Sequence, residues 1–215
     1  MDFIAQPDDK FRLGDFLIRS FGDTDWTDFR AAVAFVKRSG TKHIREALAA
    51  FSKRARVRIS VGIDSGGTSI EGLQDLIAAV GTTGQIWVFH NANNSTFHPK
   101  IYLFKNTSAA DLVIGSGNLT EGGLYTNYEA SVRLKLDLSR SEHRALLASA
   151  EAALDRWSTL QSGICLALDH NLGRLAKCQN FLGRHRILPE DFPGHEHIHR
   201  QRLGDVEARH TGNIL

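Results

Sequence analysis

The chain has 215 residues, a formal net charge of +2, and ordinary shares of apolar (42%) and charged (23%) residues. This profile is typical of a soluble globular protein with one main domain and a sizeable core. A globally basic nucleic-acid-binding protein is excluded, so any such surface must be a local patch. No run approaches 18 apolar residues, and the first ten residues do not resemble a signal peptide. We therefore expect a cytoplasmic protein with no membrane-spanning segment.

The first half of the chain alternates expected helices and strands. Apolar residues three and four apart predict the helices, and buried or alternating apolar runs predict the strands. The expected helices are 10–21, 41–51 and 68–80, and the expected strands are 28–36, 57–63 and 86–89. A capping box formed by Thr68 and Glu71 is expected to open the third helix. This order favours parallel strands with a site at their carboxyl ends.

The alternation of helices and strands ends after residue 96. Expected strands over 98–104, 111–115 and about 127–136 then follow one another with short connections. At least some of these strands should pair antiparallel. A second capping box, at Ser139 and Glu142, predicts a long helix that runs to Trp157. The fold class expected is α/β, with a mixed, mostly parallel β-sheet flanked by helices on both faces.

Two segments are expected: a catalytic domain over residues 1–163 and a C-terminal extension over residues 164–215. The extension contains many of the histidines, and apolar residues are sparse after Leu188. Three interpretations stay open for it, namely a partly disordered tail, an arm for an oligomer or partner, and the start of a second domain. We predict no metal site and no cofactor.

The residues that carry chemistry lie between His98 and Glu129. His98 and Lys100 are two apart on an expected strand, so their side chains should share one face. The next strand ends in the turn 115–118, Gly-Ser-Gly-Asn, which offers backbone and side-chain donors. A third extended segment brings the carboxylate of Glu129. A nucleophile or base, a cation, an anion cradle and a carboxylate together predict a phosphate-processing site.

Two sequence motifs carry a resemblance to a known family. The segment 97–102 reads Phe-His-Pro-Lys-Ile-Tyr, and 114–120 reads Ile-Gly-Ser-Gly-Asn-Leu-Thr. In these motifs the chain resembles the phospholipase D superfamily over about residues 10–160. It is most similar to the nuclease branch, which includes metal-independent restriction endonucleases and helicase-associated domains. The resemblance implies a phospholipase D-like fold.

The resemblance also implies a role for each residue of the motif. His98 corresponds to the nucleophile that forms a phosphohistidine, and Lys100 to the phosphate-binding cation. Ser116 and Asn118 correspond to donors for the non-bridging oxygens, and Glu129 to the carboxylate that bonds the other imidazole nitrogen.

Two further positions are candidates for substrate binding. The chain departs from the family at Lys105, which stands where the superfamily has an aspartate, and Lys105 is one such candidate. Thr120 is the other, and capping of the turn after Asn118 is an equal alternative for it.

These roles predict a phosphodiesterase, and within that class a metal-independent endonuclease that cleaves DNA. A neutral, oriented imidazole can attack a phosphodiester, and preorganised donors stabilise the charge that develops. The leaving oxygen needs a proton, which the family obtains from a second motif copy. Because this chain has one copy, we expect a homodimer with a composite site.

Two other interpretations stay open. One is a non-catalytic DNA-binding module that works with a restriction or helicase partner. The other is a phospholipid phosphodiesterase or transferase, which the single motif, the missing aspartate and the lack of a membrane-binding helix disfavour.

Overall fold

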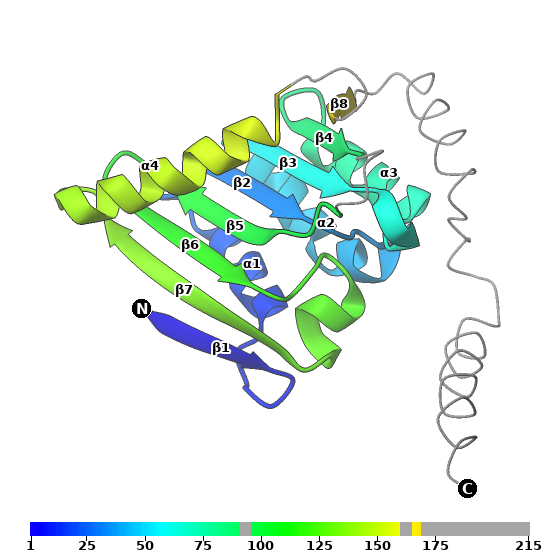
Figure 1. Ribbon diagram of the computed structural model, residues 1–215, viewed down its shortest axis with the longest axis horizontal. Coiled ribbons are helices and arrows are strands. Elements are labelled where there is room, and N and C mark those ends of the chain that lie inside the picture. Colours follow the sequence, from blue (N-terminus) through cyan, green and yellow to red (C-terminus); the bar gives the residue numbers. More distant parts are fainter. Residues whose placement is uncertain (91–95, 160–164, 169–215) are drawn as a thin grey trace, which may run out of the picture.

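The computed structural model describes residues 1–90, 96–159 and 165–168. In this part of the chain, eight strands form one sheet in the order β1-β7-β6-β5-β2-β3-β4-β8 (Figure 1). The strands are β1 (Asp2–Gln6), β2 (Asp28–Val33), β3 (Arg56–Gly62), β4 (Gln85–Phe89), β5 (Lys100–Lys105), β6 (Ala109–Gly115), β7 (Glu129–Asp137) and β8 (Cys165–Leu168).

The expectation of a mostly parallel sheet is wrong. Only the pairs β2–β3 and β3–β4 are parallel, and the other described pairs are antiparallel. The parallel strands are those joined by helical crossovers, as the alternation in the first half indicates. The turn 106–108 between β5 and β6 is too short for a crossover, and β6 and β7 also run in opposite directions. The edge strand β1, which the sequence patterns did not predict, pairs antiparallel with β7.

Helices cover both faces of the sheet, as expected. Three of them, α1 (Leu13–Gly22), α2 (Arg38–Ser52) and α3 (Ile70–Val80), pack on one face, and α4 (Ser141–Arg156) crosses the other (Figure 1). The core under the three helices contains a cluster of aromatic rings in edge-to-face and tilted contacts: Phe16, Phe21, Phe29, Phe51 and Phe104. The core under α4 is smaller and mostly aliphatic.

Neither expected capping box forms. Ser69, one residue after Thr68, caps α3 by accepting a hydrogen bond from the backbone N–H of Gly72 at 3.1 Å. The Thr68 hydroxyl is buried and donates to the carbonyl oxygen of Gly62 instead. At α4 the N-cap is Arg140, which forms an ion pair with Glu142. A neighbouring hydroxyl therefore caps α3, whereas no side chain caps the first turn of α4, and both helices start close to where they were expected.

The antiparallel insertion of β5 beside β2 determines where a site can form. Val33, at the carboxyl end of β2, is opposite Lys100, the first residue of β5. Gly115 ends β6 and is opposite Ser131, near the start of β7. The carboxyl ends of β2, β3 and β4 therefore share one edge of the sheet with the start of β5, the end of β6 and the start of β7.

The short strand β8 comes from the segment expected to be a C-terminal extension, and it pairs with the outer edge of β4. Residues 169–215, which include the expected arm, lie outside the described residues. Among the helices that are described, none is long and apolar enough to cross a membrane.

Candidate active site

The expected cation and nucleophile are in direct contact. The Nζ atom of Lys100 lies 2.6 Å from Nδ1 of His98, 3.0 Å from its Nε2 and 3.2 Å from its backbone oxygen. His98 lies two residues before the first residue of β5 and is exposed, whereas Lys100, that first residue, is 7% exposed. An ammonium group can donate only to an unprotonated ring nitrogen, so this contact requires a neutral imidazole.

The surroundings of both groups favour their neutral forms. Partial desolvation of the ring, followed by the nearby positive charge of Lys100, lowers the pKa of His98 from its usual 6.5. Burial also lowers the pKa of Lys100, and the charge of Glu129 acts in the opposite direction. His98 is therefore neutral at neutral pH, which is the state that a nucleophile needs.

Backbone contacts hold the turn 115–118 against the rest of the site. The Ser116 hydroxyl accepts a hydrogen bond from the N–H of Ala130 at 3.1 Å, next to Glu129. Asn118 accepts from the N–H of Phe35 at 3.1 Å through its amide oxygen, which leaves its NH2 group as the donor on the other side. The Phe35 ring in turn packs edge-on against His98, with centroids 5.7 Å apart.

Close packing explains the glycines of this turn. A Cβ atom on Gly115 would lie 2.5 Å from the carbonyl oxygen of Ala130 and would also clash with the Ser131 hydroxyl. The Gly117 carbonyl accepts a hydrogen bond from the fully buried Tyr102 hydroxyl at 2.9 Å. Burial, and then the charge of Glu129, raise the pKa of Tyr102, so its phenol stays a donor. The sequence predicted the turn but gave no signal that Tyr102 supports it from below.

Glu129 lies at this edge but in a different contact from the one that the family resemblance implies. Its carboxylate accepts a weak hydrogen bond from the Asn127 amide at 3.4 Å, and its charge acts on Lys100 and Tyr102. Among the described residues, the hydrogen bonds of the His98 ring come from Lys100. In this geometry Glu129 acts as the counter-charge of Lys100.

The two additional candidates, Thr120 and Lys105, have other partners in the structure. The Thr120 hydroxyl accepts a hydrogen bond from the Gly123 N–H at 3.0 Å, which is the capping alternative. Lys105 is at the far end of β5, roughly 17 Å from Lys100 at the usual rise of a strand, and forms an ion pair with Glu151. Lys105 therefore lies apart from the site.

Two histidine–carboxylate pairs were not found from the sequence. Nδ1 of His90 lies 2.6 Å from Oδ1 of Asp64, where β3 and β4 end. Nε2 of His43, on α2, lies 2.7 Å from Oε2 of Glu121, in the loop after Asn118. Neither pair has a spacing that a motif would reveal, because each joins residues far apart in the chain.

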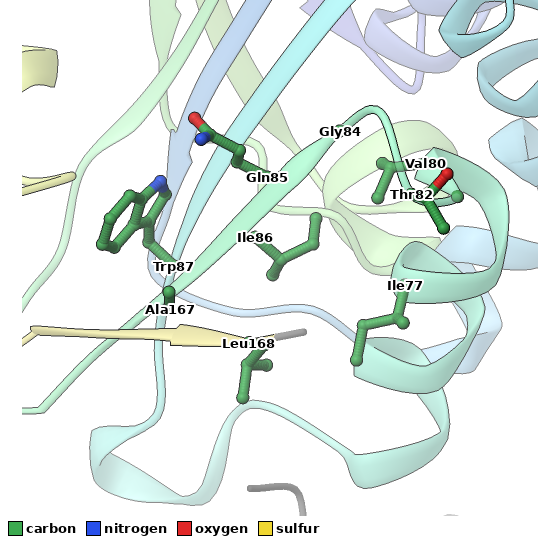
Figure 2. A pocket seen from close by; sticks show the side chains of 10 residues that line it. Ile77, Val80, Thr82, Gly84, Gln85, Ile86, Trp87, Ala167 and Leu168 are labelled. Atoms are coloured by element: carbon green, nitrogen blue, oxygen red, sulfur yellow. The ribbon is translucent and has the colours of Figure 1, made fainter. Parts of the chain in front are cut away.

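A separate cavity of about 240 Å³ lies away from these residues. It opens between the end of α3, the start of β4 and β8, and its lining includes Ile77, Ile86, Trp87 and Leu168 (Figure 2). The start of β4 is at the opposite edge of the sheet from His98, so this cavity is not part of the candidate site. In the described part of the chain, no group of three or more histidine, cysteine or acidic side chains could hold a metal ion.

The sequence itself finds no match among protein-family models or curated proteins. Its structure matches NucT from Helicobacter pylori with a TM-score of 0.54 and 13% identity, over 73% of this chain and 93% of that one. Nuc from Salmonella typhimurium, a phospholipase D family member, aligns over 73% of this chain and 90% of that one, with 20% identity and a TM-score of 0.48. The fold is phospholipase D-like.

This chain also matches parts of some larger proteins of known structure. The yeast tyrosyl-DNA phosphodiesterase aligns over 63% of this chain but 32% of its own length, with 12% identity and a TM-score of 0.43. At such identities the likeness is one of fold alone. The match to NucT supports the phospholipase D-like fold that the two motifs implied.

Proposed function

We propose that this protein is a phosphodiesterase, and within that class a metal-independent endonuclease that cleaves DNA by way of a phosphohistidine on His98. One observation carries the proposal, namely the contact between a neutral, exposed imidazole and a nearly buried ammonium at the edge where Ser116, Asn118 and Glu129 also meet. This combination suits a phosphodiester, because it pairs a nucleophile with a fixed positive charge.

The first step is attack by a ring nitrogen of His98 on phosphorus. A P–N bond forms while the bond from phosphorus to the leaving oxygen breaks, and that oxygen takes a proton from an acid. Lys100, the Ser116 hydroxyl and the Asn118 amide NH2 group donate to the non-bridging oxygens as negative charge accumulates on them. Each important donor of this kind contributes about 3–4 kcal/mol to such a transition state.

Hydrolysis of the intermediate reverses these roles. The group that served as acid now takes a proton from water, the water oxygen bonds to phosphorus, and the P–N bond breaks to regenerate neutral His98. We assign the acid to His98 of a second copy of this chain, so that one composite site forms across a twofold axis. The choice of DNA as the substrate follows from the resemblance of the two sequence motifs to the nuclease branch of the phospholipase D superfamily.

The proposal is tested by nicking of supercoiled plasmid in EDTA. The wild type should nick the plasmid with or without the chelator, and His98→Ala should be at least about 10³-fold slower, because it lacks the nucleophile. His143→Ala is the matched control, since this half-buried histidine lies in α4 and contacts the backbone of Asp137.

Three results of this assay would count against the proposal. Loss of nicking in EDTA would refute the metal-free mechanism, and equal activity of His98→Ala and the wild type would refute the assigned nucleophile. Binding of plasmid without any nicking would identify a DNA-binding module instead.

A further inference from the structure

We infer that Tyr128 stacks on an unpaired nucleobase beside the candidate active site, and that the substrate is therefore single-stranded DNA. This inference rests on the proposed function, whose substrate class it narrows. Tyr128 directly precedes Glu129, and its side chain is 83% exposed. Among the phenylalanine, tyrosine and tryptophan side chains that the structure describes, it is the most exposed.

The backbone on both sides of Tyr128 is held in place. Before it, Asn127 is already extended (φ −78°, ψ 158°), and its N–H donates to the carbonyl oxygen of Gly122 at 3.0 Å. After it, the N–H of Ala130 donates to the Ser116 hydroxyl at 3.1 Å, and the N–H of Ser116 donates to the carbonyl oxygen of Ala130 at 3.0 Å. A tyrosine on such a backbone has two side-chain torsions to fix, so stacking on its ring costs little conformational entropy.

The ring of Tyr128 and the carboxylate of Glu129 belong to different faces of the sheet. The charge of Glu129 acts on Lys100, and successive residues of an extended chain point to opposite faces. Tyr128 and Ala130 are therefore on the face that α4 crosses, and both are exposed. Figure 1 shows α4 running from the end of β7 away from its start, so the face is open beside Tyr128. A phosphate bound at the edge of the sheet would have room for its base on this face.

The separation between the ring and the phosphate donors is on the scale of one nucleotide. Tyr128 is two residues from Ala130, and Ser116 is hydrogen-bonded to Ala130 on the neighbouring strand. At about 3.3 Å per residue and about 4.8 Å between strands, the Cα atoms of Tyr128 and Ser116 are roughly 8 Å apart. A nucleotide whose phosphate is held by Ser116 and Lys100 can thus place a base over the tyrosine ring.

Base pairing decides which nucleic acid can use this ring. Neighbouring pairs cover both faces of an internal base in a duplex, whereas a single strand exposes its bases to aromatic side chains. Stacking of this kind tolerates any sequence, because every base has a π-face. One open aromatic ring beside a cluster of phosphate donors therefore suits a single strand better than a duplex.

The test is an abasic scan of a short single-stranded oligonucleotide at one fixed salt concentration. Fluorescence anisotropy measures its binding to the full-length chain with His98→Ala, which lacks the proposed nucleophile. Loss of the base at one position should weaken binding by about 5- to 150-fold, the value of one stacked base. With Tyr128→Ala added, the same abasic position should cost less than about twofold, because the base has no ring to lose.

Two matched variants and a duplex complete the experiment. Tyr128→Phe should restore the position-specific loss, and Phe3→Ala, which removes another exposed ring (66%), should leave it intact. Tyr128→Ala should lose affinity for the single strand and keep its affinity for the same oligonucleotide annealed to its complement. A thermal unfolding scan verifies that each variant is folded.

An abasic profile that is the same with and without Tyr128 would overturn the inference, as would equal losses on single strand and duplex. A Tyr128→Ala protein that changes its association state in sedimentation but binds the single strand normally would also overturn it, and would identify a protein contact instead. Binding that depends on Tyr128 without any cleavage of DNA would refute the proposed function and leave the stacking role standing. Cleavage that is indifferent to Tyr128 would do the reverse.

Discussion

In the proposed mechanism, His98 and Lys100 need opposite protonation states although they are in contact. His98 must be neutral to attack phosphorus, and Lys100 must be charged to bind phosphate. Burial lowers the pKa of both groups, and the positive charge of Lys100 lowers the pKa of His98 further. The positive charge of Lys100 is maintained against these effects partly by Glu129.

Replacement of Lys100 by methionine should raise the pKa of His98, because the nearby positive charge is lost. The neutral nucleophile exists above its pKa, so the acid limb of the residual pH–rate profile should move to higher pH. Titration of the His98 ring protons by NMR measures the same shift without catalysis. Lys105→Met, at the other end of β5, should leave the titration unchanged. A His98 pKa that stays the same or falls in Lys100→Met would contradict the coupling.

The Glu129→Gln substitution should move the alkaline limb in the opposite direction. Glu129 raises the pKa of Lys100, so its removal lowers that pKa further. The charged amine is lost as pH rises through its pKa, and the alkaline limb should therefore move to lower pH. An alkaline limb that stays in place, with only a lower maximal rate, would show that Glu129 acts elsewhere than on Lys100.

At this scale the sequence predicted which motif residues lie near one another better than it predicted their contacts. The motif residues His98, Lys100, Ser116, Asn118 and Glu129 all meet at one edge of the sheet. Phe35, which links Asn118 to His98, could not be predicted, because the contact depends on how β2 meets the turn in three dimensions. The hydrogen bond of Glu129 was not predictable either, since it depends on side-chain rotamers.

The turn that carries Asn118 is fixed to the start of α2. The backbone of Leu119 forms a bridge with Val36 and accepts a hydrogen bond from the N–H of Lys37 at 3.0 Å. Gly40, in the first turn of α2, lies so close that a Cβ atom would be 2.5 Å from the Leu119 backbone. The helix and the turn can pack this closely only because residue 40 has no side chain.

The Gly40→Ala substitution should destabilise the protein by about 1–3 kcal/mol, because the added methyl group meets backbone that cannot rotate away. It should also lower nicking activity, since it displaces the residue next to Asn118. Gly22→Ala, at the end of α1, meets no atom within 4 Å and should instead be neutral or stabilise by up to ~1 kcal/mol. Urea unfolding midpoints measure both effects, and equal midpoints for the two variants would refute the close-packing argument.

Element types were more predictable than their ends or their order in the sheet. Long amphipathic segments such as α2 and α3 have a strong helical period, so they were located correctly. The start of α3 was misplaced because two adjacent hydroxyls could cap the helix. The Thr68 hydroxyl donates to the Gly62 carbonyl at the end of β3, so Ser69 is the residue that caps α3. The strand β1 was missed because five residues at a sheet edge, two of them exposed at its start, carry little periodic signal.

Ionic contacts connect α4 to the middle of the sheet. Arg30, which is 3% exposed, places its guanidinium 2.7 Å from the carboxylate of Asp155, whose side chain is 62% exposed. Arg58 lies 3.9 Å from the same carboxylate and also pairs with Asp28. Burial, and then the charge of Arg58, lower the pKa of Arg30, so its positive charge depends on these carboxylates.

Asp155→Asn should therefore destabilise the protein more than Arg30→Met does. The first change leaves two arginines close together with one carboxylate fewer, at an expected loss of about 1–3 kcal/mol that the exposure of Asp155 moderates. The second change removes the buried charge and keeps an apolar side chain of similar length. Urea unfolding at neutral pH compares the two variants, and an Arg30→Met protein less stable than Asp155→Asn would contradict the argument.

At the scale of the whole molecule, the α/β class and the two helical layers were predictable, whereas the sheet topology was not. The patterns of β5, β6 and β7 identify strands, but nothing in them specifies that β5 inserts beside β2 instead of extending the sheet from β4. That insertion places Lys100 opposite Val33 and so forms the site. Strand order is set by packing among segments distant in sequence, which local patterns do not encode.

The pairing of β1 with β7 also has a consequence for synthesis of the chain. Ile4 is opposite Ser131, so β1 cannot pair until β7 has been made. At a synthesis rate of 5–20 residues per second this delay is roughly 6–25 s. Pairing of β1 with β7 also closes a long loop, and the entropy cost of that closure makes the pairing a late step in folding. A ribosome that stalls before Glu129 would hold a chain in which His98 is present but β7 is absent, so that β6 would be an unpaired edge of the sheet. Completion of the edge and completion of the catalytic cluster are therefore the same late event.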